Sequence, residues 1–365
     1  MEYKVISADC HINEPPGTFV DRVPKHLKDR APRIMPSQDG GDGWSWDGKP
    51  PKQGFGLNAL AGRAYEGYKF GGIKFADIMP GNYDGKAHLE DMAKDGVDAS
   101  VVYPLAGLGT YTCPDRELAL ACVSAYNDWL IDEFCAYDPK RLISLPILPV
   151  DDGMDVTLAE LKRVAKKGAK GVFVPGCPAR PYQDRYYDPL WAAAQAAGLS
   201  VNMHRNHGGK PPAPDTQDDF VAGIVIRFFS SIRPFTNMIF TGVFERFPNL
   251  RLVAAETNIG WMPFWIEEMH NEWTRQRHWA KLPIQRSPRE YVASNVHATF
   301  LDDKAGFALL DMIPPTAPMY STDYPHSVTI WPNSRQVIEG LTKGLAPDLK
   351  HKVLAGNAVK VYNLN

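Results

Sequence analysis

The stretch Leu250-Arg251-Leu252-Val253-Ala254-Ala255-Glu256 is an almost purely apolar run of strand length that ends in a carboxylate. A run without alternating polar residues is typical of a strand that is buried on both faces, as in a parallel sheet covered by helices. A charge at the end of such a strand is costly unless a cation or hydrogen-bond donors meet it. The stretch therefore predicts a buried parallel sheet with a polar site at one end of its strands.

Seven further segments have the same short, apolar or β-branched character. They lie at residues 4–8, 98–103, 142–148, 171–174, 199–203, 296–300 and 318–322. Helix-length segments with apolar residues three and four apart separate them, at residues 117–134, 156–165 and 190–197, the last closed by Gly198 in the position of a helix stop. Eight strands that alternate with helices predict an α/β fold, a (β/α)₈ TIM barrel, in which functional side chains lie at the carboxyl ends of the strands.

Length and composition indicate a single domain over residues 1–365. The chain is 44% hydrophobic, which suffices for the core of one barrel with insertions. Its net charge of −2 leaves no basic surface for nucleic acid. The N-terminus enters a strand at once and no stretch of 18 apolar residues occurs, so we expect neither secretion nor a membrane span. Five scattered cysteines without a CxxC pair suit a reducing compartment, and we expect a cytoplasmic protein.

Residues 12–85 form a connection that is much longer than a usual barrel loop. The segment is rich in glycine, proline and aromatic residues, among them Trp44 and Trp46. Because it leaves the top of the first strand, we expect it to form a lid or pocket wall, with both tryptophans against the substrate. An insertion that only packs on the barrel rim or forms a subunit contact is an equal alternative. A second segment, 211–240, contains the apolar run 220–229 and predicts a helix on the flank of the site.

Polar side chains follow four of the predicted strands. They are Asp9 and His11, His204 to His207, Glu256, and Asp323 to His326. Asp9 and His11 lie two residues apart on a strand, so both side chains point to the same face and can offer an oxygen and a nitrogen to one ion. Each segment alone is more often structural, but together at the same end of one barrel they favour a metal centre.

The chemistry of the remaining polar residues leaves alternatives open. His204 is the better metal ligand, whereas His207 suits a second ligand, a proton shuttle or a substrate contact. Asp323 suits both a metal ligand and the group that takes a proton from a metal-bound water. Glu256 either joins the site or pairs with an arginine, Arg205 or Arg251. Arg205 in turn suits bidentate binding of a substrate carboxylate.

These motifs resemble the amidohydrolase-related family of metal-dependent barrel enzymes, in the branch that includes 2-amino-3-carboxymuconate-semialdehyde decarboxylase and the aromatic-acid decarboxylases. The resemblance extends over nearly the whole chain and is carried by residues 9–15, 88–98, 188–191, 244–250, 256–263, 321–326 and 356–358. It implies that a divalent metal is bound by Asp9, His11, His204 and Asp323. Glu14, His207, Glu256 and His326 remain candidates for binding a second ion or for supporting the first.

The chain departs from the family pattern in two places. Many relatives open with His-x-His, whereas Asp9-Cys10-His11 gives a harder, more anionic site, so zinc is expected first but manganese or iron becomes an alternative. In dinuclear relatives a strand-four lysine bridges two metals. Here Lys170 lies at the start of that strand, so one or two ions remain open, without a lysine bridge.

Three reactions fit this family. We expect first a hydrolase that acts through a metal-activated water on a small aromatic or apolar carboxylate or carbonyl compound, with Asp323, His207 and Glu256 as catalytic groups. The alternatives are a non-oxidative decarboxylase of an aromatic or unsaturated acid and a dinuclear iron or manganese–iron oxygenase. We expect the substrate to contact Arg205, Trp44, Trp46 and Tyr324. Family habit and the aromatic segment 261–279 predict a homodimer.

Overall fold

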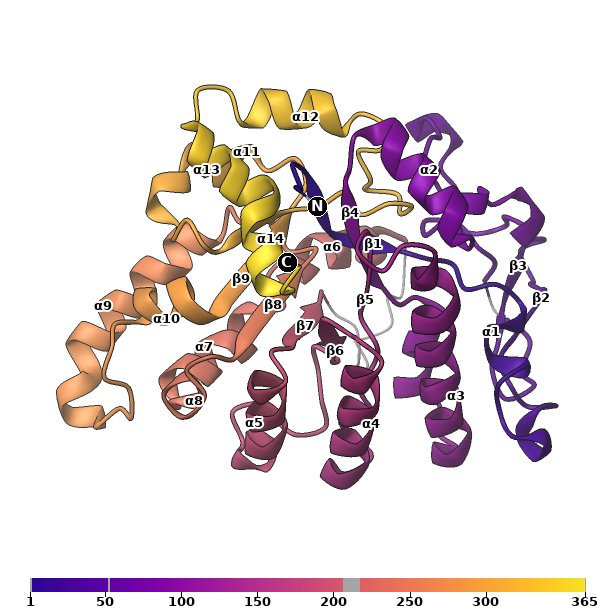
Figure 1. The fold of residues 1–365 in the computed structure, drawn as a ribbon, viewed down its shortest axis with the longest axis horizontal. Coiled ribbons are helices and arrows are strands. Elements are labelled where there is room, and N and C mark those ends of the chain that lie inside the picture. The colour runs from indigo at the N-terminus through magenta and orange to yellow at the C-terminus, as the bar shows by residue number, and fades with distance from the viewer. Residues whose placement is uncertain (1, 52, 206–216, 365) are drawn as a thin grey trace.

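The computed structural model describes residues 2–51, 53–205 and 217–364; for residues 217–219 it describes the backbone alone. Eight parallel strands stand in the middle of the molecule and helices surround them (Figure 1). The strands are β1 (Ile6–His11), β4 (Ala99–Tyr103), β5 (Leu142–Ser144), β6 (Gly171–Phe173), β7 (Ser200–His204), β8 (Arg251–Ala255), β9 (Val296–Phe300) and β10 (Pro318–Tyr320). Each overlaps a segment predicted from the sequence, and the predicted barrel is confirmed.

The strands form two sheets, in the orders β1-β4-β5 and β10-β9-β8-β7-β6, and backbone contacts join these sheets at both edges. On one side, Ile147 bridges to Phe173 in parallel fashion. On the other side, the backbone N–H of Asp323 donates to the carbonyl of Asp9 at 3.0 Å, and that of His11 donates to Tyr324 at 2.6 Å. The second contact brings the segment after β10 directly beside the end of β1, where the polar residues of both lie.

The helices cover the outside of the strands and complete the barrel. They are α1 (Gly17–Val20), α2 (Gly85–Asp95), α3 (Arg116–Trp129), α4 (Met154–Lys166), α5 (Asp188–Ala196), α6 (Gln217–Arg227), α7 (Ile232–Phe240), α8 (Val243–Arg246), α9 (Met262–Ala280), α10 (Pro288–Asn295), α11 (Lys304–Ala308), α12 (Ser334–Leu341), α13 (Pro347–His351) and α14 (Asn357–Val361). Gly198 ends the turn after α5 at φ 66°, a left-handed conformation that glycine adopts at low cost. Within the described residues, none of these helices has the length and hydropathy to cross a membrane.

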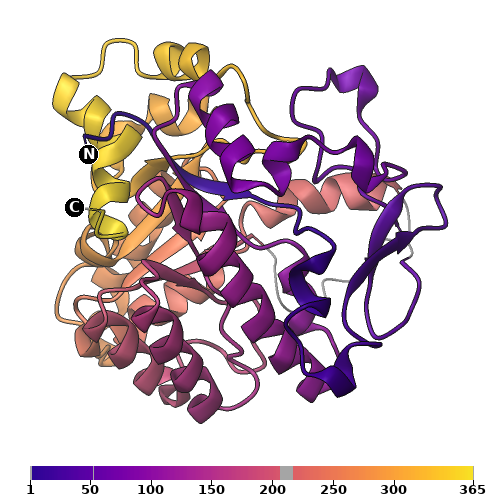
Figure 2. The ribbon, with the colours of Figure 1, turned by 45° about the vertical axis from the view of Figure 1, so that its right-hand side comes forward.

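The insertion after β1 forms a small unit with its own core. Its strands β2 (Arg33–Pro36) and β3 (Asp42–Ser45) pair as an antiparallel hairpin, which stands beside the barrel (indigo in Figure 2). Phe55, Leu60 and Ile73 are buried together in this unit. The N–H groups of Leu60 and Ala61 donate to the carbonyl of Pro325 at 3.0 and 3.1 Å, so the insertion is anchored on the loop that follows β10.

Candidate metal centre

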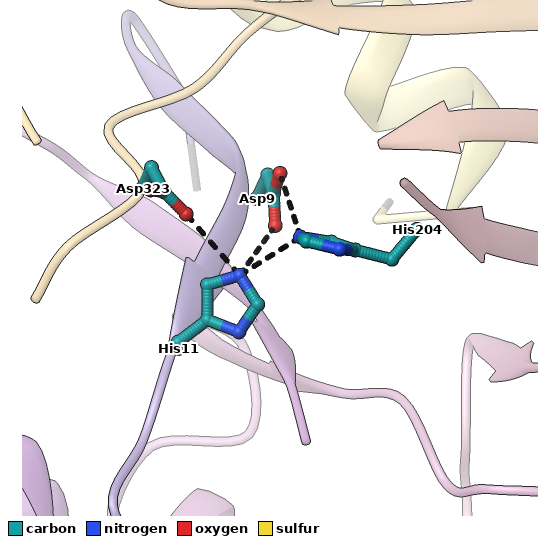
Figure 3. A group of neighbouring side chains, drawn as sticks. All are labelled: Asp9, His11, His204 and Asp323. Atoms are coloured by element: carbon teal, nitrogen blue, oxygen red, sulfur yellow. Dashed lines mark hydrogen bonds and ion pairs between the residues drawn. The ribbon is translucent and has the colours of Figure 1, made fainter. Parts of the chain in front are cut away.

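Four side chains from three strand ends converge at the top of the barrel (Figure 3). Asp9 and His11 come from β1, His204 is the last residue of β7, and Asp323 follows β10. All four are buried, and one ligand atom from each lies within 4.8 Å of the others. The register of β1 shifts between Ser7 and Cys10, yet both predicted side chains of this strand still face the cluster.

The spacing of the donor atoms suits a single divalent ion. Nε2 of His11 lies 3.0 Å from Nε2 of His204, 3.2 Å from Oδ1 of Asp323 and 3.4 Å from Oδ1 of Asp9. Nε2 of His204 lies 3.8 Å from Oδ2 of Asp9. Donors held about 2.1 Å from one ion are separated by about 3.0 to 3.4 Å at octahedral and tetrahedral angles. The set of two nitrogens and two carboxylates is thus compatible with a divalent cation.

The charges of the cluster call for a cation as well. The carboxylate oxygens of Asp9 and Asp323 receive no well-aligned hydrogen bond from the residues described. Burial raises the pKa of Asp9 to about 6, whereas His11 opposes this shift. Burial alone would lower the pKa of His11, but the adjacent carboxylates of Asp323 and Asp9 outweigh it and raise the pKa to about 10. Positive charge is therefore favoured at His11 Nε2, where a divalent ion would supply it.

Glu256 and Asp323 both have an unusual backbone conformation. Glu256 has φ 54° and Asp323 has φ 49°, in the left-handed region that non-glycine residues rarely occupy. The surrounding structure fixes both turns: the N–H of Glu256 donates to Thr299 Oγ1 at 2.7 Å, and that of Asp323 donates to Asp9. Each turn ends a strand and leaves a carboxylate at the mouth of the barrel.

Glu256 connects the cluster to an arginine. Its Oε2 lies 3.1 Å from Nε2 of His204, and its Oε1 pairs with Nη2 of Arg205. The guanidinium of Arg205 also stacks over the ring of Phe228, 4.7 Å from the ring centroid. Arg251, the other partner considered for Glu256, instead donates to the carbonyls of Gly198 and Lys360 at the opposite end of β8.

The environments of the carboxyls of Glu256 and Asp323 push their pKa values in opposite directions. Burial raises the pKa of Glu256 well above its ordinary value, with the charge of Asp323 adding to the shift. Burial also acts to raise the pKa of Asp323, but His326 and His11 outweigh it and lower the pKa. Such a pair separates an acid that keeps its proton from a carboxylate that does not.

His326 lies next to the cluster. Its ring stacks on that of His11 with centroids 3.8 Å apart, and its Nδ1 lies 3.2 Å from Oδ1 of Asp323. With His11, Glu256 and Asp323 it forms a second group of side chains whose ligand atoms lie within 4.8 Å of one another. His11 and Asp323 belong to both groups, so Glu256 and His326 are the donors that the second group adds.

Other predicted site residues lie elsewhere. Glu14 is buried, but its carboxylate accepts the N–H groups of Leu105, Ala106 and Gly107 at 3.1, 2.8 and 3.1 Å, so it holds the loop after β4 and not the cluster. The hydroxyl of Tyr324 donates to Asp91 on α2 at 2.6 Å, away from the barrel mouth. His207 lies outside the described residues.

Trp44 and Trp46 lie in the insertion but away from the cavities, in contrast to the substrate contacts predicted for them. They pack on Phe19, with ring centroids 5.3 and 5.7 Å apart, and do not line the described cavities beside the cluster. Trp44 lies in β3 and Trp46 follows directly after the strand, two residues on, so both side chains share one face, which covers the barrel rim. The insertion reaches the cavities through other residues, namely Leu57, Asn58, 63–66 and Tyr68.

Two cavities adjoin the cluster. The smaller, of about 160 Å³, contacts Glu256, His326 and Arg205 directly. The remaining walls come from Leu57, Asn58, Leu105, Phe220, Ile224, Arg227, Ser327 and Val328. The larger, of about 630 Å³, shares Glu256 and Val328 with the smaller one and is lined by 63–66, Tyr68 and 328–331. Most of these wall residues do not follow a strand; in the sequence, the long insertion 12–85 and the apolar run 220–229 were the two segments that indicated walls.

Comparison with known proteins identifies the family. A sequence model described as amidohydrolase matches residues 8–364, almost the whole chain. The chain belongs to the amidohydrolase family. The family predicted from the strand-end motifs is confirmed, and the protein is an enzyme of the amidohydrolase superfamily.

Similar proteins are found among sequences and structures. The 2-amino-3-carboxymuconate-6-semialdehyde decarboxylase of Dictyostelium discoideum is 25% identical over 296 residues, 80% of each chain. An amidohydrolase from Mycobacterium avium subsp. paratuberculosis K-10 has a TM-score of 0.77 at 21% identity, with coverage of 100% of this chain and 98% of that one. A dihydroxybenzoic acid decarboxylase from Polaromonas sp. JS666, with bound manganese and the inhibitor 2-nitroresorcinol, has a TM-score of 0.67 at 17% identity, with coverage of 100% and 98%. The two structures show the shared fold.

Proposed function

We propose that the protein is a metal-dependent, non-oxidative decarboxylase of a small aromatic or unsaturated carboxylic acid. The observation that carries the proposal is Glu256, a buried acid with a raised pKa that borders both the cluster and the adjoining cavity. The decarboxylases among the similar proteins support this reaction over the hydrolysis expected first from the sequence. The apolar walls of the smaller cavity suit a single ring.

Asp9, His11, His204 and Asp323 would hold one divalent ion. When bound, such an ion would supply positive charge that binds the substrate carboxylate and stabilises the negative charge that develops on the substrate. The charged oxygens of Asp9 and Asp323 suit a hard ion, and a similar decarboxylase binds manganese, so we place manganese ahead of zinc.

Glu256 supplies the proton in this reaction. The bond between the ring carbon and the carboxylate breaks, carbon dioxide leaves, and the electron pair stays on carbon. Glu256 then gives its proton to that carbon and regains one from solvent. This step requires a carboxylic acid that holds a proton, and burial, which raises the pKa of Glu256 well above its ordinary value, favours that form.

Arg205 favours a single ion over two. Its guanidinium contacts the carboxyl group of Glu256, which would have to bind the second ion together with His326. A fixed cation at this place repels another. This arrangement weighs against the dinuclear oxygenase, which needs two redox ions.

The test is release of labelled carbon dioxide. Protein loaded separately with manganese and zinc is given carboxyl-labelled dihydroxybenzoates in deuterated water, in air and under anaerobic conditions. We expect labelled carbon dioxide and one deuterium on the ring carbon that carried the carboxylate, at equal rates with and without oxygen. Hydrolysis of the matching benzamides or esters without decarboxylation would favour the hydrolase, and turnover only in air would favour the oxygenase; either result contradicts the proposal.

A further inference from the structure

The smaller cavity carries two guanidinium groups in unequal situations. Arg205, just after β7, and Arg227, the last residue of α6, both line it. Arg205 is paired with Glu256. Arg227 has no carboxylate partner within the residues that the structure describes, and its polar surroundings there are the like charge of Arg205 and the more distant Glu256.

The position of Arg227 is costly without an anion. Burial lowers the pKa of Arg227, and the nearby charge of Arg205 lowers it further. Contact with the ring of Phe220, 5.6 Å from the guanidinium carbon to the ring centroid, offsets only part of this cost. A partly buried arginine that faces a cavity and lacks a partner is suited to bind an anion there.

The rest of the cavity fits a ring between the two charged ends. Apolar side chains from the insertion, the loop after β4, α6 and the loop after β10 form its walls: Leu57, Leu105, Phe220, Ile224 and Val328. Glu256 and His326 mark the end toward the cluster, and Arg227 stands on the α6 wall. A flat apolar body with an acid group at each end matches this distribution of charge.

We propose that Arg227 binds a second carboxylate of the substrate, so that the natural substrate is an aromatic dicarboxylic acid. The inference rests on the proposed function for the first carboxylate, which lies at the cluster. The guanidinium of Arg227 binds the second one, bidentately where the geometry allows. Arg227 thereby determines specificity and takes no part in the bond-breaking step.

The test compares two ligands that differ by one carboxylate. Binding of benzoate and of benzene-1,3-dicarboxylate to manganese-loaded protein is measured by calorimetry, in wild type, Arg227→Gln and Arg227→Lys. Arg233→Gln, an exposed arginine on the next helix, is the matched control. We expect the dicarboxylate to bind at least tenfold tighter than benzoate to wild type and to the control. Arg227→Gln should remove that ratio with little change for benzoate, and Arg227→Lys should restore part of it.

Three results would overturn the subsite. In wild type they are equal affinities for benzoate and the dicarboxylate, or no detectable binding of the dicarboxylate. In Arg227→Gln it is an equal loss of affinity for both ligands. The calorimetry requires no turnover. If the ratio of the two affinities changes among the variants as expected but no acid is decarboxylated, the proposed function is wrong and the subsite is supported. If decarboxylation occurs and the ratio is absent, only the subsite fails.

Discussion

The backbone and the side chain of Asp323 are both fixed by contacts with neighbouring segments. It follows β10 in a left-handed conformation, its N–H is bound to β1, and its carboxylate lies between His11 and His326. These contacts keep the carboxylate ionised and directed to the cluster. The loss of its charge therefore affects the centre directly, while the backbone contacts remain.

We predict that Asp323→Asn leaves the fold intact and lowers turnover by about a hundredfold or more, since an amide gives neither a full charge nor an anionic donor to the ion. Turnover, metal content and circular dichroism are measured together. Asp311→Asn, an exposed aspartate away from the site, controls for the chemical change. Normal turnover with full metal content in Asp323→Asn would show that the carboxylate is not part of the centre.

Glu256 allows the acid role to be separated from metal binding. Glu256→Gln should keep one equivalent of metal, because the cluster of Asp9, His11, His204 and Asp323 does not include it, and should lower decarboxylation by about two to four orders of magnitude through loss of the proton. Glu256→Asp should recover part of the rate. A fall from two equivalents of metal to one in Glu256→Gln would instead indicate a dinuclear centre.

At the scale of elements, the strands were predictable and their loops were not. A buried parallel strand must be apolar along its length, so β8 and its polar end are visible in the sequence. The roles of Glu14, Tyr324, Trp44 and Trp46 depend on which segment each side chain contacts in the folded chain. Glu14 is satisfied by three backbone N–H groups far along the chain, and no local pattern encodes that contact.

The contact of Glu14 with residues 105–107 gives a prediction about an element that shapes the cavity, since Leu105 is part of its wall. Glu14→Gln exchanges an acceptor oxygen for an amide donor that faces backbone N–H groups. We expect a loss of about 1 to 3 kcal/mol in the free energy of unfolding, measured with denaturant, and a higher KM with little change in kcat. Glu339→Gln on the exposed side of α12 should change neither. Unchanged stability would mean that the loop holds without this carboxylate.

At the scale of the molecule, the cluster joins segments that close the barrel. Asp9 and His11 belong to β1, and His204 ends β7 on the opposite sheet. Asp323 follows β10, whose following segment is joined to β1 by backbone hydrogen bonds and by the N–H of Thr322, which donates to Ser7 Oγ at 3.0 Å. An ion held by these residues therefore connects strands from both sheets, and without it two buried carboxylates face each other across the closure.

Because the ion binds the folded barrel and not the unfolded chain, its removal should lower the melting temperature. An ion present at a hundred times its dissociation constant contributes about 2.7 kcal/mol, which corresponds to a decrease of several degrees. We expect chelation to produce this decrease and manganese to reverse it, with element analysis at each step. His204→Ala, which removes one ligand, should melt near the chelated wild type and respond little to either treatment. Equal melting temperatures for wild type with and without bound metal would show that the cluster does not link the strands through an ion.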